Sequence, residues 1–125
     1  MDHLALAISD QARSRRFYEK YLDFTSESEP RSDGVLLLHG ATGFALALGE
    51  TTEPISVPEF LHFGLGLSSA GGVRAFADRL VADGVEIVGQ WDEPDYVSVK
   101  FRDPDGYVVE VSWEPEPSGP RSSVT

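Results

Sequence analysis

An internal repeat constrains the fold of this chain more than any other feature of its sequence. Residues 3–9 read His-Leu-Ala-Leu-Ala-Ile-Ser, and residues 62–68 read His-Phe-Gly-Leu-Gly-Leu-Ser, at an offset of 59 residues. A second match, between residues 43–48 and residues 106–111, follows at an offset of 63 residues. A repeat near this period indicates duplicated supersecondary units that bury a shared face.

Length and charge limit the class of protein. The 125 residues suit one domain, and the absence of cysteine excludes disulfides, thiolate metal sites and a cysteine nucleophile. The formal net charge of −11 disfavours nucleic acids and anionic membranes as partners, because proteins bind both mainly by neutralising phosphates. No apolar run approaches the ~18 residues of a membrane span, and no leader-like segment precedes the first expected strand. We therefore expect a cytoplasmic protein.

Hydrophobic periodicity predicts the same order of elements in both halves. In the first half, strands are expected at residues 3–8, 24–29, 35–39 and 44–48, with a helix after the first strand. In the second half, strands are expected at residues 60–67, 85–88, 96–101 and 107–113, with a helix that Ser69 caps.

The predicted fold class is therefore α+β, with two tandem βαβββ modules in a single domain over residues 1–114. The modules cover about residues 1–49 and 60–114, and they form a curved mixed sheet, a half-barrel cup with helices on its convex face. Residues 50–59, which contain two prolines, form the linker. Residues 115–125, rich in Pro, Gly and Ser, are expected to be a disordered tail.

Side-chain parity predicts which residues face a pocket, because successive residues of a strand point to opposite faces. The face away from the helices carries one histidine followed by small residues in each module: His3, Ala5, Ala7, His62, Gly64 and Gly66. From the last strand, Glu110 has the parity to face the same space. Two imidazoles and one carboxylate form a facial triad that suits Mn, Fe, Ni, Co or Zn.

Other polar and aromatic residues surround this predicted site. Ser98 and Lys100 share the parity of Glu110 and are expected to orient a substrate, although a plain ion pair explains Lys100 equally well. Trp91 and Tyr96 flank an acidic loop and either close over a flat ligand or pack at the pocket rim. His39 is predicted on the helix side, because its parity matches that of Phe101 in the second module.

These segments together resemble the vicinal oxygen chelate superfamily, which includes glyoxalase I, extradiol dioxygenases, bleomycin-resistance proteins and fosfomycin-resistance thiol transferases. The matching pieces are residues 3–10, 17–18, 22–24, 62–65 and 103–110, the last reading Asp-Pro-Asp-Gly-Tyr-Val-Val-Glu. Asp23 stands where the family usually has glycine, at a turn that Asp tolerates. The resemblance implies metal ligands at His3, His62 and Glu110.

The resemblance leaves the activity open. The fourth ligand position of glyoxalase I falls at Ala47, which cannot bind a metal, so glyoxalase I chemistry is disfavoured. Extradiol dioxygenases are usually longer and add a catalytic histidine, and the fosfomycin-resistance transferases have a potassium loop and an arginine that have no counterpart here. We expect a metal-dependent lyase, dioxygenase or thiol transferase acting on vicinal oxygens of a small substrate. The alternative is a metal-free, bleomycin-resistance-like protein that sequesters a planar antibiotic.

The resemblance also implies a homodimer. In many single-chain relatives the two modules pair across subunits, so His3 of one subunit meets His62 and Glu110 of the other. A site within one chain is the alternative, and the linker is compatible with both.

Overall fold

The structure is a computed structural model that describes residues 2–116. The chain forms two compact units. The described part of unit 1 contains residues 2–60 and 103–107, and that of unit 2 contains residues 61–102 and 108–116. Most of the tail that the sequence predicts to be disordered, residues 117–125, lies outside the described residues.

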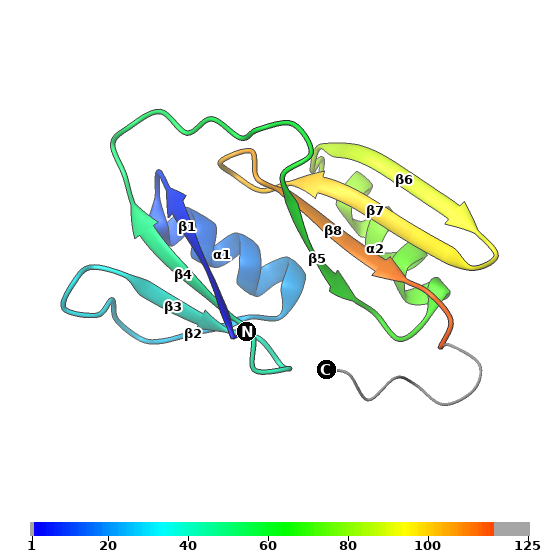
Figure 1. Cartoon of the computed structure of the whole chain (residues 1–125), viewed down its shortest axis with the longest axis horizontal. Helices are drawn as coiled ribbons and strands as arrows, with labels where there is room; N and C mark the ends of the chain where they lie inside the picture. Colours follow the sequence, from blue (N-terminus) through cyan, green and yellow to red (C-terminus); the bar gives the residue numbers. More distant parts are fainter. Residues whose placement is uncertain (1, 117–125) are drawn as a thin grey trace. The chain divides into compact units, whose positions relative to one another are not determined.

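Unit 1 contains a four-stranded mixed sheet and one helix (Figure 1). Its elements in chain order are β1 (His3–Ile8), α1 (Gln11–Leu22), β2 (Thr25–Ser26), β3 (Leu36–His39) and β4 (Ala45–Glu50). The strand order is β1-β4-β3-β2, with β1 parallel to β4 and the remaining pairs antiparallel.

Unit 2 repeats this arrangement (Figure 1). Its elements are β5 (His62–Gly66), α2 (Ala70–Ala82), β6 (Ile87–Glu93), β7 (Tyr96–Arg102) and β8 (Val108–Trp113). The strand order is β5-β8-β7-β6, and β5 is parallel to β8. Both units have the order βαβββ, so the predicted α+β class with two tandem modules is confirmed.

Capping residues set the ends of both helices. The side chain of Asp10 accepts a hydrogen bond from the Arg13 amide at 3.0 Å, and that of Ser69 accepts one from the Gly72 amide at 3.0 Å. Each bond satisfies a backbone donor that the first turn of a helix leaves without a partner. Asp23 ends α1 with a φ of 55°, a left-handed conformation that Asp tolerates.

Apolar side chains on the helix-facing side of each sheet form the cores. In unit 1, Ile8, Leu38, Leu46 and Leu48 are completely buried. In unit 2, the buried residues are Val73, Ala77, Leu80, Val97, Val99, Phe101, Val109 and Val111. Burial of each Val, Leu, Ile or Phe side chain contributes about 1.5–3 kcal/mol to folding. The expected apolar stripe of α2 is wrong at Val81, which is 64% exposed at the edge of that stripe.

The second hairpin differs from its prediction. The expected strand at residues 85–88 and acidic loop at residues 92–95 are replaced by one longer strand, β6. Asp92 and Glu93 pair with Val97 and Tyr96 of β7, so ladder hydrogen bonds outweigh the low strand propensity of acidic residues. In unit 1 the reverse occurs, because β2 contains only two residues of the expected strand at 24–29.

Within residues 2–116, neither helix is long and apolar enough to cross a membrane.

Candidate functional site

The sheet of unit 2 has one face covered by α2 and one face that carries the predicted site residues. On the covered face, the rings of Phe76 and Phe101 lie 5.4 Å apart. On the other face, Gly64, Glu110 and Lys100 lie opposite one another on β5, β8 and β7. A second row contains Gly66, Ser112, Ser98 and Trp91. Opposed residues on paired strands point to the same face, so the register gathers the unit 2 site residues on one surface.

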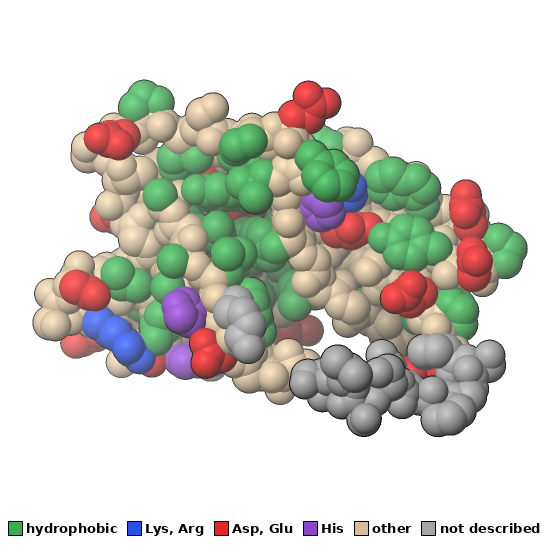
Figure 2. Space-filling view, in the orientation of Figure 1, with side chains coloured by type: hydrophobic (Ala, Val, Ile, Leu, Met, Phe, Trp, Pro, Cys, Tyr) green, Lys and Arg blue, Asp and Glu red, His purple; other side chains and the backbone are tan. Residues whose placement is uncertain are grey.

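Glu110 lies at the centre of this surface. One carboxylate oxygen, Oε2, accepts hydrogen bonds from the hydroxyl groups of Tyr96 and Ser98. The other oxygen, Oε1, lies 3.5 Å from Nε2 of His62. In Figure 2 a histidine, an acidic and a basic side chain meet here among apolar side chains. The carboxylate is thus held in one orientation, with one oxygen directed at an imidazole.

The surroundings of Glu110 keep it ionised. Burial acts to raise the pKa of Glu110, but the hydrogen bonds from Ser98 and Tyr96 and the charge of Lys100 outweigh burial and hold it below its ordinary value. The pKa of the Tyr96 hydroxyl is raised, first by burial and then by its bond to Glu110. Tyr96 therefore remains a neutral hydrogen-bond donor to a charged acceptor.

A glycine that sequence reasoning missed makes room for Trp91. A Cβ atom at Gly89 would lie 2.9 Å from the Trp91 ring, which is closer than real Cβ contacts. The ring lies 5.1 Å from Nζ of Lys100, within cation–π range, and Trp91 is 41% exposed. The only sequence signal for this arrangement is a glycine within a strand, which often marks a close approach of neighbouring atoms.

The two predicted glycines of the pocket floor have different surroundings. A Cβ atom at Gly64 would lie 3.1 Å from the Glu110 carbonyl oxygen, so this glycine allows β5 to lie close to β8. At Gly66 a Cβ atom would meet nothing within 4 Å, so this position borders open space.

Unit 1 contains a cavity of about 380 Å³ beside His3. The register places His3 and His39 opposite Ala45, on the two strands that flank β4. His39 therefore shares the face of His3 and lines the same cavity, so the prediction that it faces the helix side is wrong. Its parity was taken from Phe101, whereas the 63-residue offset of the neighbouring strands matches His39 to Arg102.

Both histidines of this cavity are bound to carboxylates. Nδ1 of His3 lies 2.9 Å from Oδ1 of Asp2, and Nε2 of His39 lies 3.0 Å from Oε2 of Glu27. Ala47 and Leu37 add apolar walls, whereas Ala5 and Ala7, expected in the pocket floor, are exposed and are not among the residues that line the cavity.

The predicted metal ligands are therefore distributed between two units. His62 and Glu110 lie together in unit 2, and His3 lies in unit 1. Among residues 2–116, no three His, Asp or Glu side chains gather closely enough to hold a metal ion.

A second acidic cluster, which sequence reasoning treated only as a turn, lies in unit 1. Residues 103–107, here named the acidic turn, connect β7 to β8 but belong to unit 1. The Asp103 carboxylate accepts a hydrogen bond from the Tyr18 hydroxyl at 2.7 Å and bonds at 2.9 Å from the amides of Asp105 and Tyr107. Burial raises the pKa of Asp103 despite these hydrogen bonds.

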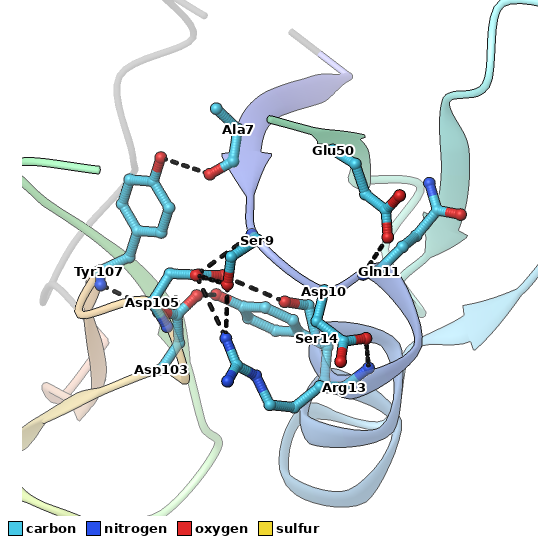
Figure 3. Close-up of polar contacts among 11 residues, drawn as sticks. Ala7, Ser9, Asp10, Gln11, Arg13, Ser14, Glu50, Asp103, Asp105 and Tyr107 are labelled. Carbon is cyan, nitrogen blue, oxygen red and sulfur yellow. Dashed lines mark hydrogen bonds and ion pairs between the residues drawn. The ribbon is translucent and has the colours of Figure 1, made fainter. Parts of the chain in front are cut away.

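The side chain of Asp105 joins the acidic turn to the start of α1 (Figure 3). It accepts hydrogen bonds from the Ser9 hydroxyl at 2.6 Å, from Arg13 at 3.3 Å and from Ser14 at 3.4 Å. The Tyr107 hydroxyl donates to the Ala7 carbonyl at 2.8 Å. Every acceptor in this cluster is occupied by a group of unit 1, so we assign the cluster to the fold and not to ligand binding.

Comparison with known proteins agrees with this architecture. Residues 1–111 match the Glyoxalase/Bleomycin resistance protein/Dioxygenase superfamily, and the chain belongs to this superfamily. No curated protein matches the chain closely enough to count as a relative.

Solved structures with the same fold differ in what they bind. A possible glyoxalase from Bacillus cereus is 26% identical, with a TM-score of 0.76 over 89% of this chain and 96% of that chain. A mutant of the fosfomycin resistance protein FosX from Listeria monocytogenes, complexed with Mn(II) and a dihydroxypropylphosphonic acid, is 17% identical, with a TM-score of 0.75 over 89% of this chain and 86% of that chain. TnmS3, an antibiotic-binding protein from a Streptomyces species, is 24% identical, with a TM-score of 0.71 over 92% of this chain and 95% of that chain.

Proposed function

We propose that this protein is a metal-dependent enzyme that acts on vicinal oxygens of a small molecule, with a divalent ion held by His3, His62 and Glu110. The observation that supports this most directly is the 3.5 Å separation between Nε2 of His62 and Oε1 of Glu110. Two donors that each lie about 2.1 Å from one tetrahedral ion are about 3.4 Å apart. The residues of unit 2 therefore fit two adjacent ligand positions.

His3 has the surroundings of a third ligand. The second nitrogen of a metal-binding histidine almost always donates to a carboxylate, a carbonyl or water. Nδ1 of His3 is bound by Asp2, so Nε2 is the nitrogen directed to a metal in this proposal. Since His3 belongs to unit 1, the proposal includes a homodimer in which each subunit completes the site of the other.

The remaining residues hold the site and the substrate. Ser98 and Tyr96 fix Glu110 through Oε2, which leaves Oε1 for the ion. Lys100 contributes a positive charge beside Glu110, and its contact with Trp91 fixes its position near a negatively polarised substrate. When bound, the ion supplies Lewis acidity to two adjacent substrate oxygens.

Metal content tests the ligand set without a known substrate. Protein without a histidine tag is equilibrated with Mn, Ni, Zn or ferrous iron and analysed by mass spectrometry. We expect Glu110→Gln to weaken uptake by more than about 100-fold, beyond the loss of an outer-shell partner, and Ser98→Ala by about tenfold. Glu93→Gln, an exposed change on the same sheet, serves as the matched control. Equal metal content in Glu110→Gln and wild type would overturn the proposal.

Mixed dimers test whether subunits share the site. His3→Gln and His62→Gln each remove one ligand, and coexpression gives heterodimers that retain one intact site of two when ligands come from different subunits. Random pairing then restores about a quarter of the wild-type metal content. Metal content that stays at the level of the single variants would exclude the shared site.

The alternative is a metal-free protein that sequesters a flat ligand. One observation favours it: both oxygens of Glu110 already face protein groups, and the partly exposed Trp91 ring offers a stacking surface on the same sheet face. Ligand binding that survives both a chelator and Glu110→Gln would support this function over the enzyme.

A further inference from the structure

The cavity of unit 1 contains a second histidine that the proposed metal site does not use. His39 and His3 line this cavity from β3 and β1, and only the methyl group of Ala45 lies between them in the register. Two strand spacings separate the two Cα atoms, roughly 9–10 Å. A small flat molecule that contacts one imidazole therefore reaches the other.

The hydrogen bond from Glu27 defines which nitrogen of His39 faces a ligand. The His39 and Arg31 hydrogen bonds hold the pKa of Glu27 below its ordinary value, so Glu27 is an ionised, acceptor-only group. Nε2 of His39, 3.0 Å away, must then be the donor, which leaves Nδ1 of the neutral ring as a proton acceptor. A carboxylate that orients an imidazole and stabilises its protonated form is the arrangement of a general base.

We propose that His39 accepts a proton from a substrate hydroxyl group in the cavity of unit 1, with Glu27 as its positioning residue. This inference rests on the proposed function, because the hydroxyl belongs to the molecule that the metal site would bind. In this step the O–H bond breaks, the proton passes to Nδ1 of His39, and the electron pair stays on the substrate oxygen. The charge of the imidazolium is balanced by Glu27, so the step needs no other reactant.

The lining of the cavity indicates the class of substrate. Leu37, Ala45 and Ala47 provide apolar walls, and Arg31 lies at the cavity with its guanidinium 3.4 Å from Glu27. Apolar walls with few polar groups suit a flat, mainly apolar body, and Arg31 adds a charge that favours the oxyanion. Phenols and catechols combine both properties.

The test uses metal-free protein in the presence of a chelator, with 4-nitrocatechol as the probe, since its anion absorbs at longer wavelength than its neutral form. We expect wild type to bind the probe as the anion at a pH where the free probe is mainly neutral. His39→Gln should lower the ratio of anion to neutral bound probe by about tenfold, the equivalent of one pKa unit. Glu27→Gln keeps an acceptor but loses the charge and should lie between the two. Glu29→Gln, an exposed carboxylate two residues away, should behave as wild type.

Nitrogen NMR on wild type provides a second readout that needs no folded variant. The chain has three histidines, so the imidazole signals are few. We expect Nδ1 of His39 to become protonated when the probe binds, while the His62 signals remain unchanged. Failure of the probe to bind, an unchanged His39 spectrum, or equal anion formation in His39→Gln would each overturn this inference. Loss of metal binding alone would overturn only the proposed function, because the probe experiment contains no metal.

Discussion

The acidic turn of unit 1 and the Glu110 site of unit 2 use the same donors for opposite purposes. In both, a tyrosine and a serine hydroxyl bind carboxylates: Tyr18 and Ser14 in the turn, and Tyr96 and Ser98 at Glu110. The difference is in the remaining neighbours. Asp103 receives its other hydrogen bonds from the backbone, whereas Glu110 faces His62 and lies near Lys100.

This difference separates a carboxylate that holds the fold from one that is available for chemistry. Burial raises the pKa of Asp103 although three donors bind it, whereas the donors and Lys100 outweigh burial at Glu110 and lower its pKa. A carboxylate enclosed by backbone amides contributes to stability. A carboxylate with one oxygen beside an imidazole contributes little to stability and remains accessible.

The largest expected contrast is in stability. Asp103→Ala leaves the buried Tyr18 hydroxyl and two amides without an acceptor, so we expect a loss of about 3 kcal/mol in the free energy of unfolding. Glu110→Ala leaves two hydroxyl groups next to the open face of the sheet, and we expect a loss of about 1 kcal/mol. Urea denaturation measures both changes, and equal losses would contradict the contrast.

The pH dependence of stability should have opposite signs at the two carboxylates. The pKa of Asp103 is raised on folding, so its contribution is present at low pH and is lost as pH rises through its folded pKa. The pKa of Glu110 is lowered on folding, so its contribution is present above the ordinary glutamate pKa and is lost as pH falls through its folded pKa.

Unfolding between about pH 3 and pH 6 tests these signs. As pH rises, wild type should lose stability relative to Asp103→Asn and gain stability relative to Glu110→Gln. Slopes of the same sign for both variants would show that the two surroundings do not differ as described.

The smallest expected effects concern glycines near Glu110. Gly89→Ala places a methyl group against the Trp91 ring, so we expect a loss of about 1 kcal/mol. Gly66→Ala faces open space and should change stability by less than about 0.5 kcal/mol. Denaturation measures both, and Trp91 fluorescence in a Trp113→Phe background should change only for Gly89→Ala.

The sequence predicted most of the fold because repetition and parity are local properties. The alternation of apolar and small residues in β1 and β5 indicated the helix-facing sides, and Asp10 and Ser69 indicated helix starts. The parity of Ser98, Lys100 and Glu110 placed them on one face, as the strand register has them.

Features that depend on register or on distant contacts could not be predicted. His39 was placed on the wrong face because the repeat offset changes from 59 to 63 residues between strands, and a shift of one residue reverses the face. The acidic turn was read as a surface turn, because its partners Ser9 and Tyr18 precede it by 96 and 85 residues.

The position of the acidic turn has a consequence for biosynthesis. A ribosome releases residues 2–60 of unit 1 long before residues 103–107, which complete that unit. Until then the Tyr18 hydroxyl lacks the Asp103 carboxylate and Ser14 lacks Asp105, so the amino-terminal half emerges with an incomplete interior. The nascent half therefore reaches its final packing only after β7 has been synthesised, and cutting the gene between the two repeats would not yield two independent proteins.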